Sequence, residues 1–164
     1  MKRSFTVTEL LVAIAIIVIL AGILIGGIGY AGRRADEAKT IAAIQTLSAA
    51  FEAYRAEKGY FPARTTAQEV KFYRKGSEKV LTLVLDSMEY SFVDKQGKPF
   101  IELNGITATT KAKAEAFADA WGNALHYQCP GTHNKAAFDL YSYGPDKTAN
   151  TEDDIANWDN ASQN

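Results

Sequence analysis

The feature that most constrains this chain is an uncharged segment near its N-terminus. It runs from Leu10 to Gly32, 23 consecutive residues without a charge and mostly aliphatic. A helix needs about 20 apolar residues to cross the hydrocarbon core of a bilayer, so the segment predicts one membrane-spanning helix. A short basic leader at residues 1–4 and a single acid, Glu9, precede it. A carboxylate at the edge of such a helix is costly. Because the apolar helix itself offers Glu9 no partner, we expect this residue to have a function.

The segment also has the basic and apolar regions of a secretory signal peptide. A signal peptide is shorter and ends in small residues before a cleavage site, whereas this segment ends in Arg33-Arg34 and continues as a helical pattern. We therefore favour an anchor that stays in the chain. Basic residues flank both ends of the segment, so charge alone leaves its orientation open.

The chain from about residue 5 to residue 58 predicts one continuous helix. No proline interrupts residues 5–61, Gly59 is a C-cap signal, and Pro62 is a stop signal. Beyond Arg33, large apolar residues recur in steps of three and four, which mark one face of a helix. These residues are Ile41, Ile44, Leu47, Phe51 and Tyr54. We expect that face to need a partner sheet.

The rest of the chain predicts a small antiparallel sheet against this helix, and therefore an α+β fold in one domain. Strands are expected at residues 98–103, 124–129 and 138–143, with turns at Gln96-Gly97 and at residues 130–134. Residues 77–88 carry apolar side chains at helical spacing and predict a short amphipathic helix.

Composition and single residues exclude several functions. The net charge of −1 argues against a nucleic-acid surface. The one cysteine, Cys129, cannot form an internal disulfide and is expected in the core. With His126 and His133 it offers too few ligands for zinc. No nucleophile elbow, P-loop or dinucleotide fingerprint is present, so no catalytic site is expected. Trp121 and Trp158 are expected to pin turns onto the sheet.

A polar loop at residues 144–154 carries three aspartates, Asp146, Asp153 and Asp154. Hard oxygen ligands on a flexible loop suit Ca²⁺, which takes six to eight oxygens from carboxylates and backbone carbonyls. Asp153 and Asp154 are adjacent and repel each other without a cation. Acidic loops are nonetheless usually only solvated, and the EF-hand spacing is not met. The residues alone leave a calcium site and a solvated loop as alternatives.

The N-terminus contains the segment Ser4-Phe5-Thr6-Val7-Thr8-Glu9-Leu10-Leu11. This segment resembles the class III signal of type IV pilins and type II secretion pseudopilins. It implies that a prepilin peptidase cuts between Ser4 and Phe5, that Phe5 is then N-methylated, and that Glu9 recruits each subunit to a filament. Ser4 stands where the family nearly always has glycine. In related filaments the N-terminal helix of each subunit unwinds locally. The pair Gly26-Gly27 therefore has two alternative interpretations: local melting of the helix on assembly, or close packing of helices in the membrane.

A second and independent resemblance lies in the C-terminal part of the chain, which is similar to the major pseudopilins of type II secretion, the G subunits. It is carried by Asp119-Ala120-Trp121-Gly122-Asn123, Tyr127-Gln128-Cys129-Pro130-Gly131, Asp139-Leu140-Tyr141-Ser142-Tyr143-Gly144-Pro145-Asp146 and Asp153-Asp154-Ile155-Ala156-Asn157-Trp158. The family has proline where this chain has Ala120.

The same resemblance bears on the acidic loop. In these pseudopilins calcium is bound by an aspartate followed seven and eight residues later by two more. The match implies Asp146, Asp153 and Asp154 as carboxylate ligands. It also implies the backbone carbonyls of Tyr143 and Thr151 as further ligands.

Together the resemblances imply a leader at residues 1–4, a transmembrane and polymerisation helix at residues 5–32, and a periplasmic head at residues 33–164. The head has a type IV pilin-like fold, a long helix on a small antiparallel sheet with a C-terminal calcium loop. The chain would cross the bacterial inner membrane once, with its N-terminus in the cytoplasm.

The implied function is that of a structural subunit of a type II secretion pseudopilus, which polymerises to drive export of folded proteins across the outer membrane. Implied partners are further copies in a helical filament, minor pseudopilins, the platform protein, the secretion ATPase complex and the prepilin peptidase. Two alternatives stay open: a type IV pilin for adhesion, motility or DNA uptake, and a membrane-anchored periplasmic binding or sensor domain. The lack of a disulfide pair and the acidic loop weigh against the pilin.

Overall fold

The computed structural model describes residues 6–75, 80–85, 88–102, 107–109 and 115–158, with the backbone alone at residues 23–29, 64–65, 73–75, 80, 107–109 and 115. The chain divides into two compact units, residues 1–36 and 37–164, and one helix, α1 (Val7–Lys58), has residues in both. Within the described ranges, no helix combines the length and the apolar character that a membrane crossing requires.

Helix α1 confirms the predicted helix from Val7 onward, while Phe5 lies outside the described residues. Its C-terminal end is the predicted glycine cap. Gly59 has a φ of +85°, and its N–H donates to the carbonyl of Arg55 at 2.8 Å. A glycine in this left-handed conformation satisfies a carbonyl that would otherwise be left unpaired at the helix end.

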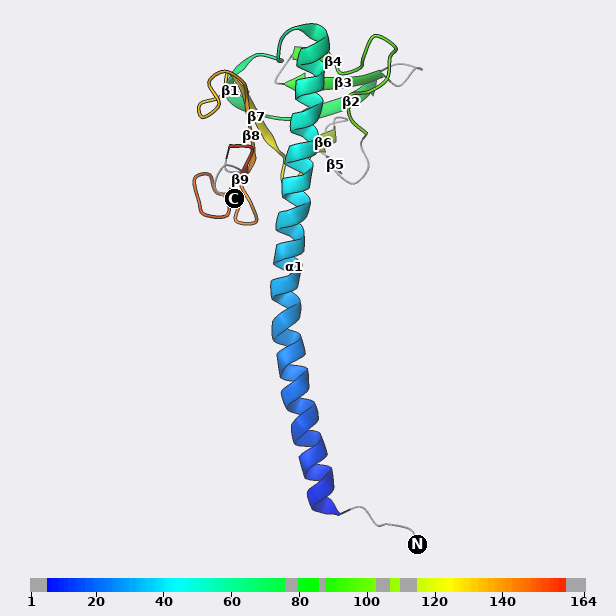
Figure 1. Cartoon of the computed structure of the whole chain (residues 1–164), viewed down its shortest axis with the longest axis vertical. Helices are drawn as coiled ribbons and strands as arrows, with labels where there is room; N and C mark the ends of the chain where they lie inside the picture. The colour runs from blue at the N-terminus through cyan, green and yellow to red at the C-terminus, as the bar shows by residue number, and fades with distance from the viewer. Residues whose placement is uncertain (1–5, 76–79, 86–87, 103–106, 110–114, 159–164) are drawn as a thin grey trace. The chain divides into compact units, whose positions relative to one another are not determined.

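The second unit contains two antiparallel sheets (Figure 1). The four-stranded sheet has the order β1 (Arg64–Glu69), β7 (His126–Cys129), β8 (Asp139–Ser142), β9 (Ile155–Ala156). The five-stranded sheet has the order β4 (Met88–Ser91), β3 (Val80–Leu85), β2 (Lys71–Lys75), β6 (Glu115–Phe117), β5 (Thr107–Thr109). Strands β7 and β8 confirm two of the predicted strands, and the α+β class is confirmed.

The predicted short helix at residues 77–88 is wrong. Its described residues form β3 and the start of β4, and β3 pairs with β2 on one side and with β4 on the other. Leu81, Leu83 and Leu85 are at most 2% exposed. Because side chains alternate along a strand, these three share one buried face. The apolar spacing fits a helix as well, but the hydrogen-bonding partners on both sides of the segment favour the strand.

The predicted strand at residues 98–103 is also wrong over the residues described. Pro99 forms only an isolated bridge, because proline has no N–H to donate to a ladder. The predicted turn before it is confirmed. There Gly97 has a φ of +78°, and the carboxylate of Asp94 accepts the N–H of Gln96 at 2.9 Å.

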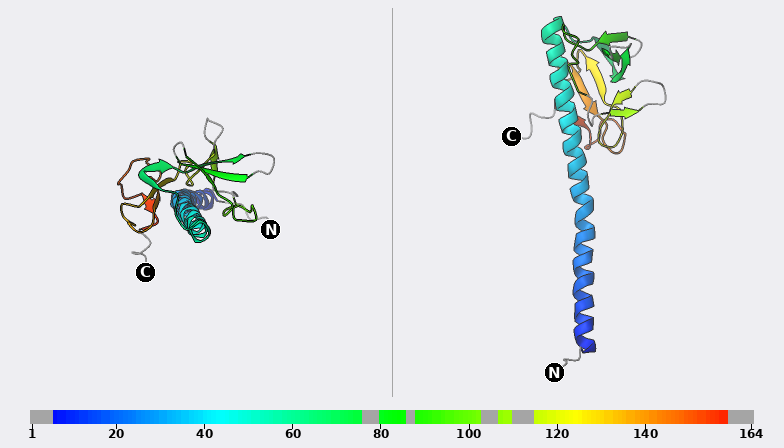
Figure 2. Two further views of the ribbon diagram at one scale, coloured as in Figure 1. Left: turned by 90° about the horizontal axis from the view of Figure 1, so that it is seen from above. Right: turned by 90° about the vertical axis from the view of Figure 1, so that its right-hand side faces the viewer.

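The core lies between the α1 residues of the second unit and both sheets (Figure 2). Phe51 is at its centre and is fully buried. Its ring centroid lies 4.5 Å from that of Tyr127 in β7, 5.3 Å from that of Phe138 just before β8, and 5.5 Å from that of Phe92 just after β4. One helix side chain therefore contacts elements of both sheets, which confirms the predicted apolar face.

We expect Phe51→Ala to lower the free energy of unfolding by about 3–5 kcal/mol, the usual cost of truncating a buried phenylalanine. The measurement is urea unfolding of the full chain in detergent, followed by tryptophan fluorescence. Gln45→Ala, at an exposed position of the same helix, is the control and should change stability by no more than about 0.5 kcal/mol. Equal effects of the two substitutions would contradict the central place of Phe51.

Candidate functional site

The first candidate site is Glu9, in the first turn of α1. Its Oε2 accepts the backbone N–H of Thr6 at 2.9 Å and the Thr6 hydroxyl at 2.8 Å. In return the N–H of Glu9 donates to Thr6 Oγ1 at 3.3 Å. This reciprocal pattern is a capping box. Thr6, the residue just before the helix, thus gives the Glu9 carboxylate two hydrogen-bond donors but no opposite charge.

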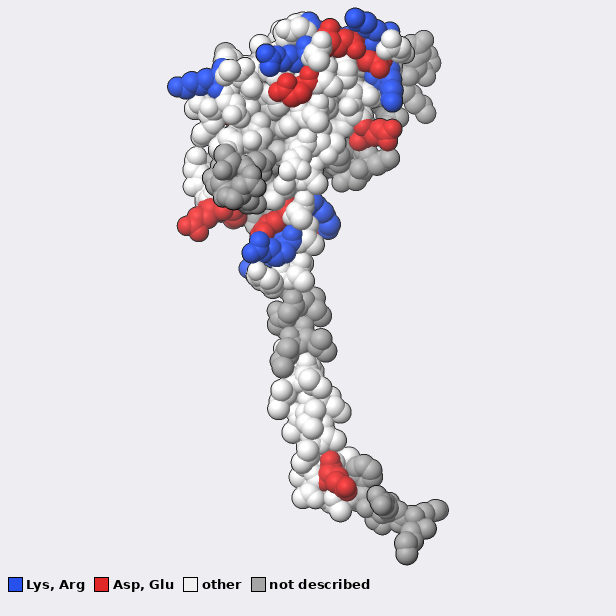
Figure 3. Space-filling model, viewed as in Figure 1, with Lys and Arg blue, Asp and Glu red and all other residues white. Residues whose placement is uncertain are grey.

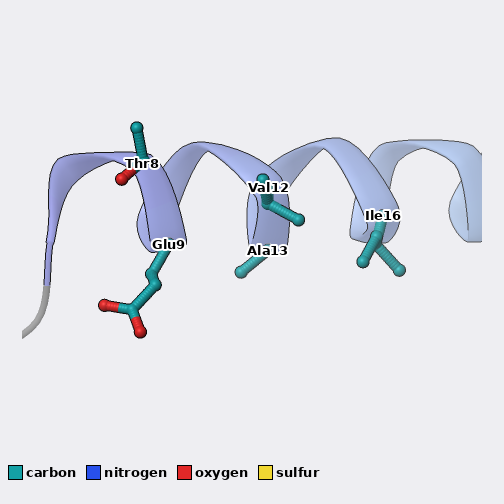
Figure 4. A pocket seen from close by; sticks show the side chains of 5 residues that line it. All are labelled: Thr8, Glu9, Val12, Ala13 and Ile16. Atoms are coloured by element: carbon teal, nitrogen blue, oxygen red, sulfur yellow. The ribbon is translucent and has the colours of Figure 1, made fainter.

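Exposed apolar side chains surround Glu9. Figure 4 shows it with Thr8, Val12, Ala13 and Ile16 along an open hollow of the helix surface. Val12 is 60% exposed and Ile16 is 51% exposed. In Figure 3, the visible and described surface of the N-terminal part of α1 is uncharged apart from one acidic side chain. An apolar surface of this extent indicates contact with lipid or with other protein chains. The predicted cleavage residues, Ser4 and Phe5, lie outside the described residues.

The second candidate site is the acidic loop between β8 and β9. The carboxylate of Asp153 accepts the Thr151 hydroxyl at 2.6 Å through Oδ1 and the N–H of Asp146 at 3.3 Å through Oδ2. The hydrogen bond from Thr151 is the main reason that the pKa of Asp153 is lowered. Asp154 Oδ2 accepts the N–H of Asn150 at 2.7 Å. The structure therefore brings these acids into one closed loop, and its hydrogen bonds favour the ionised form of Asp153.

One buried carboxylate oxygen of the loop accepts no hydrogen bond from the described residues. Asp154 Oδ1 is buried and has no partner among the described residues. A buried anionic oxygen needs a donor or a cation, and a hard oxygen of this kind fits Ca²⁺. In the described part of the chain, no three or more His, Cys, Asp or Glu side chains form a metal-binding group. Backbone carbonyls therefore have to be among the ligands of a cation in this loop, and the resemblance implies those of Tyr143 and Thr151.

A buried carboxylate that sequence reasoning missed holds the turn after β6. Asp119 is 7% exposed. Its Oδ1 accepts the N–H groups of Trp121 at 3.0 Å and Asn123 at 2.7 Å. Its Oδ2 accepts Asn123 Nδ2 at 3.0 Å and Ser142 Oγ at 2.6 Å. Four donors satisfy this carboxylate, so its role is to hold other groups in place and not to bind an ion.

Comparisons with known proteins bear directly on these features. The family model of the type II secretion system protein G matches residues 105–158. The type II secretion system core protein G of Escherichia coli K12 is 30% identical over 157 residues, which cover 96% of this chain and 91% of that protein. The chain belongs to the core protein G family. The core protein G of Pseudomonas aeruginosa is 28% identical, over 97% of this chain and 96% of its own length.

Among solved structures, the major pseudopilin from the type 2 secretion system of enterohaemorrhagic Escherichia coli aligns with a TM-score of 0.48 and 19% identity. The alignment covers 81% of this chain and 91% of that one. Membership of the core protein G family confirms the resemblance that the N-terminal and C-terminal motifs indicated.

A second buried carboxylate of this core protein G chain organises the turn after β7. Asp139 is 2% exposed and accepts the N–H groups of Thr132, His133 and Asn134 at 2.6, 2.8 and 2.8 Å. Burial disfavours its ionised form, but the hydrogen bonds from this turn outweigh burial and lower the pKa of Asp139. The turn predicted at residues 130–134 is confirmed, although the residue that closes it lies further along the chain.

Asn157 fastens the C-terminal segment to β8. Its Oδ1 accepts the N–H of Leu140 at 3.0 Å, its Nδ2 donates to the carbonyl of Phe138 at 3.0 Å, and its own N–H donates to the carbonyl of Leu140 at 2.9 Å. The next residue, Trp158, stacks on the His133 ring with centroids 4.0 Å apart. This confirms the expectation that Trp158 pins a turn onto the sheet.

The cysteine and the histidine of β7 lie in surroundings that indicate a structural role. Cys129 is a free thiol that is 8% exposed, and burial raises its pKa, which confirms its predicted place in the core. His126 lies in β7 and stacks on Tyr141 at 5.5 Å between ring centroids. Burial lowers the pKa of His126, so this histidine is held neutral at physiological pH.

Proposed function

We propose that this member of the core protein G family is a structural subunit of the type II secretion pseudopilus, and that it polymerises through the first part of α1 to drive export of folded proteins across the outer membrane. The observation that carries the proposal is the exposed apolar surface of that helix. The large apolar side chains described between Val7 and Leu20 are 50–76% exposed. Burying such a surface stabilises a protein by about 25 cal/mol per Å², which favours packing against the same helix of other copies.

Before assembly, this surface is kept in lipid. The uncharged run of 23 residues from Leu10 to Gly32 supports a single pass through the inner membrane. The N-terminus then lies in the cytoplasm and residues 33–164 form the periplasmic head. Lipid and neighbouring helices both exclude water from the same side chains, so a subunit can move between the two without exposing them. The proposed partners in this process are minor pseudopilins, the platform protein and the secretion ATPase complex.

Glu9 is the proposed contact for recruitment. Cleavage before Phe5 creates a new amino group next to Thr6, and the amine of one subunit can neutralise the Glu9 carboxylate of its neighbour. The capping box satisfies two hydrogen-bonding positions of this carboxylate but leaves its charge uncompensated. An unpaired charge in lipid costs several kcal/mol, which favours the intermolecular pair.

Calcium is the proposed cofactor of the head. Its ligands are the carboxylates of Asp146, Asp153 and Asp154 together with the backbone carbonyls of Tyr143 and Thr151. The unpartnered Asp154 Oδ1 supports the proposal. When bound, the ion supplies positive charge that offsets the repulsion between the adjacent acids Asp153 and Asp154. The chain itself orients these carboxylates, through the Thr151 hydroxyl and the N–H of Asn150.

Processing of the N-terminus is the direct test of the proposed function. Mass spectrometry of the protein from its native envelope is expected to show a chain that starts at N-methylated Phe5. Ser4→Gly, which restores the usual family residue, is the matched control and should be processed at least as completely. A native chain that keeps residues 1–4, while Ser4→Gly is cut, would show that Ser4 blocks the peptidase. Retention in both chains would contradict assembly as a pseudopilin.

A further inference from the structure

We infer that Asp119 is a positioning residue for the acidic loop: through Ser142 and Asn123 it fixes the backbone of Gly144, and so links calcium binding to helix α1. The inference rests on the calcium site proposed above. It adds three residues, Asp119, Asn123 and Ser142, that are not ion ligands. They lie on two segments that the structure brings together, the turn at residues 119–123 and the end of β8.

Gly144, the first residue of the loop, is held from both sides of its backbone. Its N–H donates to Ser142 Oγ at 3.0 Å, and its carbonyl accepts Asn123 Nδ2 at 2.9 Å. Asp119 Oδ2 in turn accepts both the Ser142 hydroxyl and the Asn123 amide. The carboxylate therefore orients the two side chains that grip Gly144. Asp119 and Ser142 are 7% and 0% exposed, so water does not replace these bonds.

The position of Gly144 decides the position of Asp153. Gly144 has a φ of +64°, a conformation that glycine adopts without the strain that a side chain adds. A Cβ at this residue would meet the backbone carbonyl of Asp153 and would come within 2.8 Å of Asp153 Oδ2. The two ends of the loop are thus in direct contact, and a shift of Gly144 moves a proposed calcium ligand.

The same turn is attached to α1. The N–H of Ala120 donates to Thr40 Oγ1 at 3.1 Å, and Thr40 is fully buried on the helix. Ala120 therefore contacts the helix, and its neighbour Asp119 contacts the loop through Ser142 and Asn123. The peptide bond between Asp119 and Ala120 joins these two sets of hydrogen bonds within the second unit.

The experiment is calorimetric titration of CaCl₂ into the full chain in detergent, after removal of calcium with EGTA and dialysis. Ser142→Ala removes the hydroxyl that joins Asp119 to the N–H of Gly144. Ser48→Ala is the matched control, because the Ser48 hydroxyl is buried and has no hydrogen-bond partner among the described residues. Loss of a residue that orients metal ligands typically weakens metal affinity by 10–100-fold. We expect Ser142→Ala to raise the Kd for calcium at least about tenfold and Ser48→Ala to leave it unchanged.

Asn123→Ala is the second variant, since Asn123 is only partly buried and its loss threatens folding less. It breaks the bond to the Gly144 carbonyl and should also raise the Kd. The melting temperature in EGTA is measured in parallel. If both variants melt lower in EGTA but bind calcium with the Kd of the unmodified chain, the residues only support the fold and the inference is overturned.

Failure of the calcium site itself gives a different result. In that case the unmodified chain shows no calcium heat, and Asp153→Ala behaves in the same way. If the unmodified chain binds, Asp153→Ala does not bind, and Ser142→Ala and Asn123→Ala both bind normally, the site stands and the positioning role is refuted.

Discussion

Glu9→Ala is expected to leave the protein in the membrane fraction but to abolish filament formation. The substitution removes the carboxylate that pairs with the amino group of the neighbouring subunit, and a pair of this kind in an apolar surrounding is worth several kcal/mol. A loss of about 3 kcal/mol for each contact lowers subunit affinity more than a hundredfold. The measurement is electron microscopy of sheared filaments, together with immunoblotting of membrane and sheared fractions.

The capping box requires a control that separates hydrogen bonding from charge. Glutamine also completes such a box, so Glu9→Gln keeps an acceptor for the Thr6 N–H and hydroxyl but removes the negative charge. We expect Glu9→Gln to fail in assembly as Glu9→Ala does. Normal filaments from Glu9→Gln, with none from Glu9→Ala, would mean that capping of α1 is what matters. Normal filaments from both would remove Glu9 from the assembly site.

Millimolar calcium is expected to raise the melting temperature of the full chain in detergent, relative to EGTA, by about 5–10 °C. A ligand at a hundredfold excess over its Kd stabilises the folded state by about 2.7 kcal/mol, and about 2–4 °C accompany each kcal/mol in a chain of this size. Asp153→Ala should remove most of this shift, because it deletes a carboxylate that the closed loop holds in place.

Glu152→Ala is the matched control for the calcium experiment. Glu152 is an exposed acid of the same loop and has no proposed ligand role, so its loss changes the net charge in the same way as the loss of Asp153. The calcium shift should persist in Glu152→Ala. Equal loss of the shift in both variants would reduce the effect to general charge screening. A melting temperature that calcium does not move would leave the loop as ordinary solvated acid.

The sequence predicted the parts of the fold that local interactions decide. Helix α1 has its apolar face, the Gly59 cap and the Pro62 stop signal within one stretch of chain. Strand β3 could not be assigned in this way, because Leu81 and Leu85 fit a helix and a strand equally. The hydrogen bonds that decide between the two are made with the neighbouring strands β2 and β4, and the apolar spacing within the segment does not reveal them.

The candidate sites also fall into those that a short motif predicts and those that only the fold reveals. Glu9 and the acidic loop were found because their acids stand at fixed spacings within a short motif. Asp119 was quoted in a motif but given no role, since its partners lie elsewhere in the fold. Ser142 is 23 residues away from it, and the contact between Thr40 and Ala120 joins residues separated by 80 positions. No spacing rule connects such residues, so only the folded chain shows that they act together.

The two sheets differ in how much variation they can absorb. Strands β2, β3 and β4 are joined by backbone ladders, and β3 is buried through alternating leucines. We therefore expect this meander to tolerate apolar substitutions that keep the alternation and the side-chain volume. The segment that carries Asp119 and Ser142 depends on individual oxygen and nitrogen atoms, few of which can be exchanged. An engineer who wishes to insert an epitope or a fluorescent reporter into the head should therefore choose the meander. The hydrogen bonds that join Asp119, Asn123, Ser142 and Gly144 would be the first lost if an insertion moved either of the segments that carry them.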